Sequence, residues 1–313
     1  MTTTDDDALA IHRSWPDEGP WVVGVDGSDC SRAALGWASA NADGRATALR
    51  LVTAWQAPVY GPHSMTGPVA VPYDVEAVES AARDDLSDLA DATRRQVEVP
   101  VEPVVVRGGA APTLLDAASD AALLVVGNRG RGGFSRLLLG STSTQCATHA
   151  PVPTAVVPGD LAARPTRRLL VGLDGSPNAM ACLEWALLFA QPGTAIDITW
   201  VWDASPLAVG ADQFFFPDAS ETAEERFHHL IDRVAASTDH EGVTITRSFV
   251  RGRPRTTLAT AAEDNDLVVV GARGHGAVGA ALLGSVSSWM LHHVHRPIVV
   301  VPDGNEPVVM DPE

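Results

Sequence analysis

The chain has 313 residues, a length typical of two ordinary domains, and 45% of them are apolar, which is enough to build hydrophobic cores. Its net charge of −17 argues against a broad nucleic-acid or anionic-membrane surface, and its 19% of charged residues is too low for a disordered chain. Three widely spaced cysteines, Cys30, Cys146 and Cys182, fit a reducing compartment and argue against a disulfide framework.

The first residues, Met1 to Asp7, are polar and acidic and lack the basic start and apolar centre of a signal peptide. No stretch approaches the roughly 20 consecutive apolar residues that a membrane helix needs. We therefore expect a cytoplasmic protein that binds neither nucleic acid nor membrane.

In chain order, residues 1–19 are expected to form a disordered tail, and the apolar run 21–26 is expected to be the first strand. Ser28 is a plausible N-cap for a helix that ends near Ala42. The other elements expected in this half are a strand at 48–55, a long loop at 56–73, a helix at 74–97, a strand at 101–106, a short helix near 114–119, a strand at 123–126, a helix at 141–149 and a strand at 152–157.

After a basic linker at 164–168 the pattern repeats. The run 169–176 matches 22–28, and Trp185-Ala186 matches Trp37-Ala38. Strands are again expected at 195–202, 243–250, 267–270 and 298–301, with a helix at 220–237. An internal duplication of about 145 residues therefore organises the chain. We expect one domain at 20–159, a second at 168–303 and a tail at 304–313.

Strands that alternate with helices predict an α/β fold, in which each repeat forms a five-stranded parallel open sheet of order 3-2-1-4-5 with helices on both faces, a Rossmann-like arrangement. Ligands of such sheets bind at the carboxyl ends of the strands, near the point where the strand order reverses. Asp26 ends the first strand and Gly127 ends the fourth, which is its neighbour in this order. Both are therefore expected to face one crevice.

A glycine motif follows the fourth strand of each half. It reads Gly127-Asn128-Arg129-Gly130, nine residues, then Gly140-Ser141, and it returns as Gly271-Ala272-Arg273-Gly274, nine residues, then Gly284-Ser285. Glycines let a backbone approach a ligand closely, and the amides of a helix start attract anions, so the motif favours phosphate binding over a plain turn. Asp26 and Asp174 could contact the ligand or cap the Asp-Gly turn. Phosphate contact and solvation both remain open for Arg129, Arg131 and Arg273.

The combination of Val-Gly-Val-Asp-Gly-Ser, the glycine motif and Pro-x-x-Val-Val resembles the universal stress protein family, in the tandem ATP-binding form common in actinobacteria. The resemblance covers residues 21–302. It implies an adenine nucleotide alpha hydrolase-like fold, one ATP in each half with Mg²⁺ held through the phosphates, and pairing of the two halves through their last strands as an intrachain pseudo-dimer. Whether two chains associate further into a homodimer stays open.

The resemblance also assigns ligand contacts residue by residue. In the first half these are Gly24, Asp26, Ala54, Gly127, Asn128, Arg129, Gly130, Arg131, Gly132, Gly133, Gly140, Ser141 and Thr142. In the second half they are Gly172, Asp174, Val201, Gly271, Ala272, Arg273, Gly274, His275, Gly276, Gly284, Ser285 and Val286. The halves differ before their fourth strands, where Ala122 matches Asp266, and this leaves open whether both bind equally well.

The sequence lacks the G-x-x-x-x-G-K-[ST] phosphate loop and the Gly-x-Ser-x-Gly elbow, so we assign no catalytic residue and no metal-ligating residue, and we do not expect an enzyme. The expected function is a regulatory nucleotide sensor of the stress response, whose ATP occupancy changes the loops at 56–73 and 207–218 and so the binding of a protein partner yet unknown. The alternatives are a slow ATPase and a nucleotide-independent interaction module.

Overall fold

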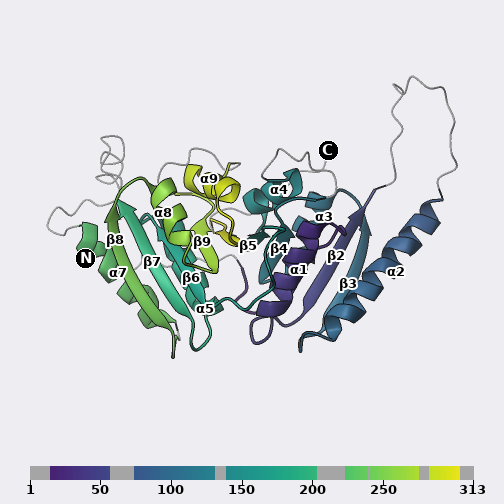
Figure 1. Ribbon diagram of the computed structural model, residues 1–313, viewed down its shortest axis with the longest axis horizontal. Coiled ribbons are helices and arrows are strands. Elements are labelled where there is room, and N and C mark those ends of the chain that lie inside the picture. Colours follow the sequence, from purple (N-terminus) through teal and green to yellow (C-terminus); the bar gives the residue numbers. More distant parts are fainter. Residues whose placement is uncertain are drawn as a thin grey trace, which may run out of the picture.

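The computed structural model describes residues 15–56, 74–130, 139–202, 223–238, 240–274 and 282–303. It consists of two similar α/β halves placed side by side (Figure 1). The first half contains β1 (Trp21–Gly24), α1 (Asp29–Asn41), β2 (Leu49–Trp55), α2 (Val75–Arg94), β3 (Val101–Arg107), α3 (Ala110–Ala117), β4 (Leu123–Gly127), α4 (Ser141–His149) and β5 (Thr154–Val157). The second contains β6 (Arg168–Leu173), α5 (Pro177–Phe189), β7 (Ala195–Trp202), α7 (Ala223–Ser237), β8 (Thr244–Arg251), α8 (Pro254–Ala262), β9 (Leu267–Gly271), α9 (Ser285–His293) and β10 (Ile298–Val301).

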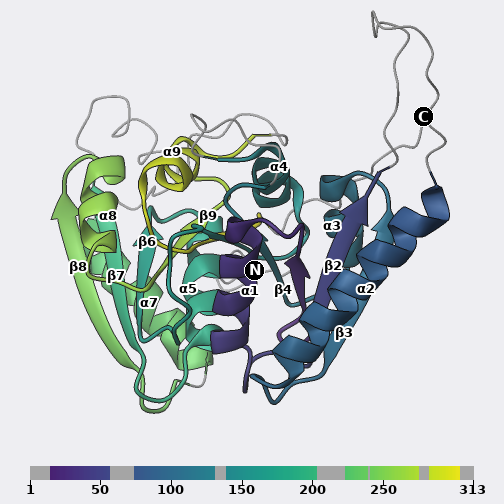
Figure 2. The same ribbon diagram turned by 45° about the vertical axis from the view of Figure 1, so that its right-hand side comes forward.

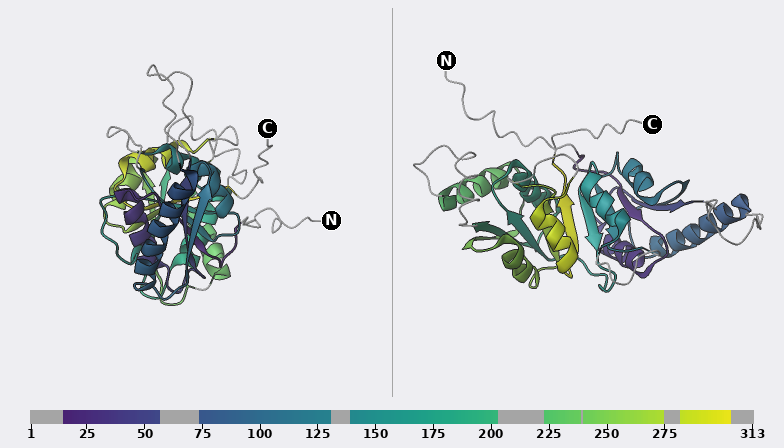
Figure 3. Two further views of the ribbon diagram at one scale, coloured as in Figure 1. Left: turned by 90° about the vertical axis from the view of Figure 1, so that its right-hand side faces the viewer. Right: turned by 90° about the horizontal axis from the view of Figure 1, so that it is seen from above.

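The ten strands of the described ranges form one sheet, in the order β3-β2-β1-β4-β5-β10-β9-β6-β7-β8. Within each half the order is the predicted 3-2-1-4-5 and every pairing is parallel. The two five-stranded parallel sheets meet at the centre of the molecule. β5 and β10 pair antiparallel, Val299 opposite Ala155, and join the two sheets at the centre (Figure 3, right). The intrachain pairing of the last strands is thus confirmed, and it removes two exposed sheet edges.

Local sequence explains where the helices begin. Ser28 caps α1 by accepting a hydrogen bond from the amide of Ser31, and Ser176 caps α5 by accepting one from the amide of Ala179. The helix expected near 114–119 was placed too late along the chain, because Gly109 is the N-cap and α3 begins at Ala110. Proline is tolerated in a first helical turn, so Pro112 does not delay the start.

An aromatic contact between helices that cover the sheet also joins the two halves. Helices α1 and α5 lie side by side (Figure 2), and Phe189 of α5 stacks on Trp37 of α1 and on Trp21 of β1, with ring centroids 6.2 and 6.1 Å away. The Arg45 guanidinium lies 4.3 Å from the centroid of the Phe189 ring and donates to the Phe189 carbonyl. Burial beside this cluster, together with the nearby positive charge of Arg167, lowers the pKa of Arg45 to about 10.

The end of the expected amino-terminal tail contributes a residue to the core. Trp15 lies within the predicted tail 1–19, yet its side chain is only 6% exposed and belongs to the core. The predicted loops at 56–73, apart from Gln56, and at 207–218, like the tail at 304–313, lie outside the described residues. Within the described ranges, no helix combines the length and apolarity that crossing a bilayer requires.

Candidate functional site

A cavity of about 530 Å³ lies at the carboxyl ends of β1, β2 and β4 in the first half. The predicted residues that line it are Gly24, Asp26, Ala54, Gly127, Arg129, Gly130, Gly140, Ser141 and Thr142. Asn128 instead borders a second cavity of about 240 Å³ at the seam between the halves, and Arg129 borders both. Arg131, Gly132 and Gly133 lie outside the described residues. The crevice expected between the first strand and the glycine motif is therefore present.

Asp26 and Gly130 both line the cavity and approach each other closely. A Cβ on Gly130 would lie 2.6 Å from Asp26 Oδ2, closer than real Cβ contacts allow. The other carboxylate oxygen, Asp26 Oδ1, accepts a hydrogen bond of 2.9 Å from the Ser28 amide across the turn at Gly27, whose φ of 77° favours glycine. Asp26 thus caps its turn and also faces the glycine motif. Capping of the turn therefore does not exclude contact between Asp26 and a ligand.

Gly24 and Gly127 hold the walls of the cavity close together. A Cβ on Gly24 would lie 3.0 Å from Leu114 Cδ1, and one on Gly127 would lie 2.7 Å from the Cys30 carbonyl oxygen. A side chain at Gly24 would push α3 away from β1, and a side chain at Gly127 would push the start of α1 away from β4. The glycines therefore serve helix packing as well as access to the cavity.

The start of α4 points free amides at the cavity. Its N-cap is Gly140, which has no side chain to cap the helix, and Ser141, Thr142 and Ser143 of the first turn line the cavity. The Gly140 amide and the Ser143 hydroxyl both donate to the Asn128 carbonyl, at 2.8 and 3.0 Å, and so tie the helix start to the residues that follow β4. Uncapped amides and the helix dipole together create a favourable position for an anion.

The second half repeats this geometry. The Ser176 amide donates to Asp174 Oδ1 at 3.0 Å, and a Cβ on Gly274 would clash with Asp174 Oδ2. Gly284 is the N-cap of α9 without a capping side chain, and its amide donates to the Ala272 carbonyl at 2.7 Å. Of the remaining predicted residues, Gly172 packs against Leu258, Val201 is buried near the end of β7, and Ser285 and Val286 open α9. His275 and Gly276 lie outside the described residues.

The difference between Ala122 and Asp266 concerns the connection of the halves rather than this site. Asp266 Oδ2 accepts hydrogen bonds from the amides of Arg167 and Arg168, both at 3.0 Å, and its Oδ1 pairs with Arg164 at 2.7 Å. Asp266 therefore fixes the linker that enters β6. It does not explain any difference in ligand binding between the halves.

The sequence analysis missed several residues of the first cavity. They are Val25, Ser31, Val52, Ala110, Leu114, Val126, Leu139 and Ser143. Four of them had a signal in the duplication, since Val126 and Leu139 recur as Val270 and Leu283, and two further residues also recur. Ser143 matches Ser287, whose hydroxyl donates to the Gly271 carbonyl, and Leu114 matches Leu258. Both positions keep the same residue in the two halves.

One buried thiol lies close to the second-half aspartate. Burial, followed by the negative charge of Asp174, raises the pKa of Cys182 well above its usual value. Burial alone raises the pKa of Cys146, in α4, to about 12. Both thiols therefore remain protonated near neutral pH and are not nucleophiles.

Known proteins share this architecture. A universal stress protein of Mycolicibacterium smegmatis is 33% identical over 295 residues, which span 90% of this chain and 96% of that protein. A universal stress protein of Mycobacterium tuberculosis is 29% identical over 313 residues, spanning 92% and 96% of the two chains. The crystal structure of a universal stress protein from Archaeoglobus fulgidus has the same fold, with a TM-score of 0.67 at 18% identity over 90% of this chain and 98% of that one.

The family assignment rests on both halves of the chain. Residues 20–158 and residues 165–302 each match the universal stress protein family, and together they span nearly all of the described structure. The resemblance inferred from the motifs is confirmed, as is its tandem form in relatives from mycobacteria, which are actinobacteria. The chain belongs to the universal stress protein family and carries two of its domains in tandem.

Proposed function

We propose that this chain is a regulatory adenine-nucleotide-binding protein with one site in each half, and that ATP with Mg²⁺ is the ligand. The observation that carries the proposal is the cavity of about 530 Å³, into which Asp26, the glycine motif and the uncapped start of α4 converge. Its volume falls within the roughly 300–1,000 Å³ typical of small-molecule sites.

The chemistry of the cavity suits a nucleotide along its length. Phosphates would lie against Gly127 to Gly130 and the first turn of α4, where no side chain caps the amides. The nucleoside would lie toward Gly24 and Ala54, beside the apolar side chains of Val52 and Leu114. A Cβ at Gly130 would collide with Asp26. Glycine at this position therefore leaves the backbone open to close approach by a phosphate.

A holding role fits the cavity better than rapid hydrolysis. Among the described residues that line it, Asp26 is the only carboxylate, and one of its oxygens is bonded within its own turn. Mg²⁺ commonly keeps several waters and binds through phosphates with one or two carboxylates, so Asp26 and the nucleotide would share its coordination. Nucleotide occupancy would then alter the surface offered to a protein partner in the cytoplasm during stress.

Equilibrium dialysis of purified protein with ATP and Mg²⁺ tests this proposal, with GTP as the control for base selectivity. Saturable binding of ATP that exceeds the binding of GTP supports it, and no binding at millimolar ATP overturns it. Phosphate release is followed in the same samples. Release that depends on Asp26 and persists through further purification would show an ATPase instead.

A further inference from the structure

The two halves differ at two positions that touch the glycine motif. Asn178 of α5 occupies the place that Cys30 has in α1, and Asp303 after β10 occupies the place of Gly159 after β5. The second correspondence follows from hydrogen bonding, because the Asn128 amide donates to the Val157 carbonyl as the Ala272 amide donates to the Val301 carbonyl. The differences are therefore located at equivalent points of the two sites.

In the second half these residues hold the motif in place. The Asn178 side-chain amide donates to the carbonyls of Val301 and Pro302, at 3.2 and 2.9 Å, and its oxygen accepts from the Arg273 amide at 3.1 Å. The Arg273 guanidinium in turn lies 3.5 Å from the Asp303 carboxylate. Both the backbone and the charge of Arg273 are thus engaged by the protein itself.

In the first half neither restraint exists. The Cys30 side chain carries no amide group that could link the motif to the end of β5. Gly159 has no carboxylate that could pair with Arg129. Replacing Gly159 is also obstructed, since a Cβ there would lie 2.5 Å from Cys30 Sγ. Across the described ranges no ion pair or hydrogen bond engages the Arg129 side chain, and its Nε is buried without a partner.

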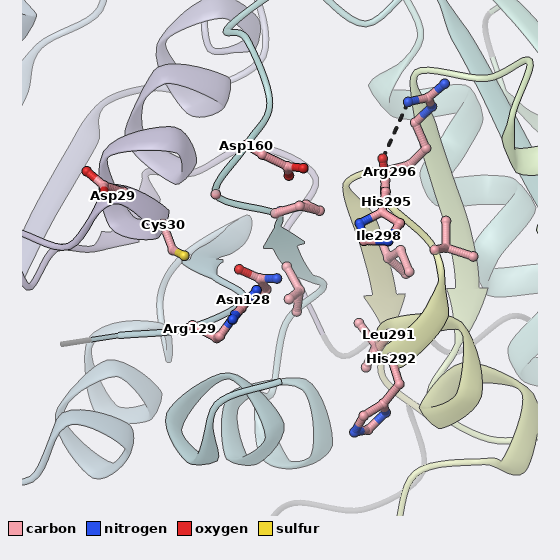
Figure 4. A pocket seen from close by; sticks show the side chains of 14 residues that line it. Asp29, Cys30, Asn128, Arg129, Asp160, Leu291, His292, His295, Arg296 and Ile298 are labelled. Atoms are coloured by element: carbon pink, nitrogen blue, oxygen red, sulfur yellow. Dashed lines mark hydrogen bonds between the residues drawn. The ribbon is translucent and has the colours of Figure 1, made fainter. Parts of the chain in front are cut away.

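Arg129 lies between two cavities. It lines the proposed nucleotide cavity, and it lines the smaller cavity at the seam. Figure 4 shows Asn128 and Arg129 between Cys30 of α1 and the segment that carries His295 and Arg296. Arg296 is held by the carbonyls of Asn265 and Glu263, at 2.9 and 2.8 Å, so its charge is directed away from Arg129.

We infer that the two sites are unequal, and that Arg129 gives the first site a preference for nucleotides with more phosphate charge. This inference rests on the proposed nucleotide binding. Arg129 can pair with phosphate oxygens at little cost, because no carboxylate in the described ranges forms an ion pair with it, although Asp26, Asp29 and Asp160 line the same two cavities. Arg273 must share its charge with Asp303, which weakens its attraction for a polyphosphate.

The experiment measures the affinities for ATP and AMP at each site separately. Gly274→Val closes the second site and leaves the first for study, while Gly130→Val does the reverse. In the first site, Arg129→Gln is expected to weaken ATP binding by roughly tenfold to a hundredfold, the equivalent of losing a charged hydrogen bond, and to reduce the preference for ATP over AMP. In the second site, Arg273→Gln is expected to weaken ATP binding by less than about threefold.

Arg83→Gln serves as the matched control, since it removes the same charge from an exposed ion pair with Glu79 on α2, far from both cavities. Equal losses of ATP affinity on changing Arg129 and Arg273 would overturn the inference while leaving the proposed function intact. Failure of the unaltered protein to bind either nucleotide would instead overturn the proposed function.

A second route does not depend on closing a site. The double change Cys30→Asn with Gly159→Asp introduces the second-half restraints into the first half of the full chain. Calorimetric titration of the unaltered protein with ATP is expected to show two classes of site, and the double variant is expected to bring their affinities together. A single class in the unaltered protein, or two classes that the double change leaves as far apart, contradicts the inference.

Discussion

A Cβ on Gly130, three residues after β4, would lie 2.6 Å from Oδ2 of Asp26, two residues after β1, so the backbone at position 130 has room only for glycine. The same relation links Gly274 to Asp174 in the second half. Because these strands are neighbours in each sheet, the duplicated contact closes one end of each candidate site. The first predictions follow from it.

Gly130→Val should abolish detectable nucleotide binding at the first site, because the branched side chain would displace Asp26 and fill the approach to the motif. Gly274→Val should do the same at the second site. Dissociation constants from calorimetry measure both effects. Gly109→Ala is the control at the same end of the sheet, since its Cβ would meet neighbours at 3.4 Å or more, and its binding is expected to stay within about twofold of the unaltered protein. Full binding by both valine variants would refute the assignment.

Asp26→Asn should separate the two roles of this residue. The amide oxygen can still accept the hydrogen bond from the Ser28 amide, so the free energy of unfolding should change by less than about 1 kcal/mol. Nucleotide affinity should fall, because the negative charge that we propose binds ribose hydroxyls or Mg²⁺ is lost. The free energy of unfolding, from urea denaturation, and the nucleotide affinity, from titration, are measured on the same protein preparation. A large loss of stability with unchanged affinity would show that Asp26 only caps the turn.

Phe189→Ala should destabilise both halves together. The ring is 5% exposed and packs on Trp21 and Trp37 of the other half, and truncating such a residue to alanine typically costs about 3–5 kcal/mol. Tryptophan fluorescence during urea denaturation reports the change. Leu188→Ala, one residue away and 40% exposed, should cost less than about 0.5 kcal/mol. If the two variants unfold at the same urea concentration, the contacts of Phe189 with Trp21 and Trp37 do not stabilise the association of the two halves.

The three cysteines should differ sharply in alkylation at pH 8. Burial raises the pKa of Cys146 to about 12, so roughly one in ten thousand of these thiols is ionised at that pH. The pKa of Cys182 is also raised, whereas Cys30 is only partly buried. Because a raised pKa suppresses the thiolate at every pH below it, native protein should be alkylated at Cys30 alone.

Peptide mass mapping checks this result, and urea should make all three cysteines reactive. Cys30→Ser should remove the native signal. Rapid alkylation of Cys146 or Cys182 in folded protein would show that α4 or α5 opens far more readily than its burial indicates.

Local signals in the sequence predicted much of the fold and part of the site. Ser28 and Ser176 indicated the starts of α1 and α5 because helix caps depend on residues close in sequence. Apolar runs indicated the strands, and their alternation with helices indicated a parallel sheet in each half. The helix start at Ala110 was missed because glycine at an N-cap gives a weak signal.

Contacts between distant segments could not be predicted in the same way. The sequence does not reveal that Asn178 bonds the ends of β9 and β10, or that Asp303 reaches Arg273, because both depend on where the last strand ends in space. The burial of Trp15 likewise depends on a core that forms only when the whole half has folded. Inequality of the two sites therefore becomes visible only in three dimensions.

Calorimetric titration with ATP and Mg²⁺ tests the central claim most directly. The unaltered protein should bind two nucleotides per chain, and Gly130→Val and Gly274→Val should each bind one. Absence of heat and of binding at millimolar ATP in the unaltered protein, or a stoichiometry that neither variant changes, would contradict the account.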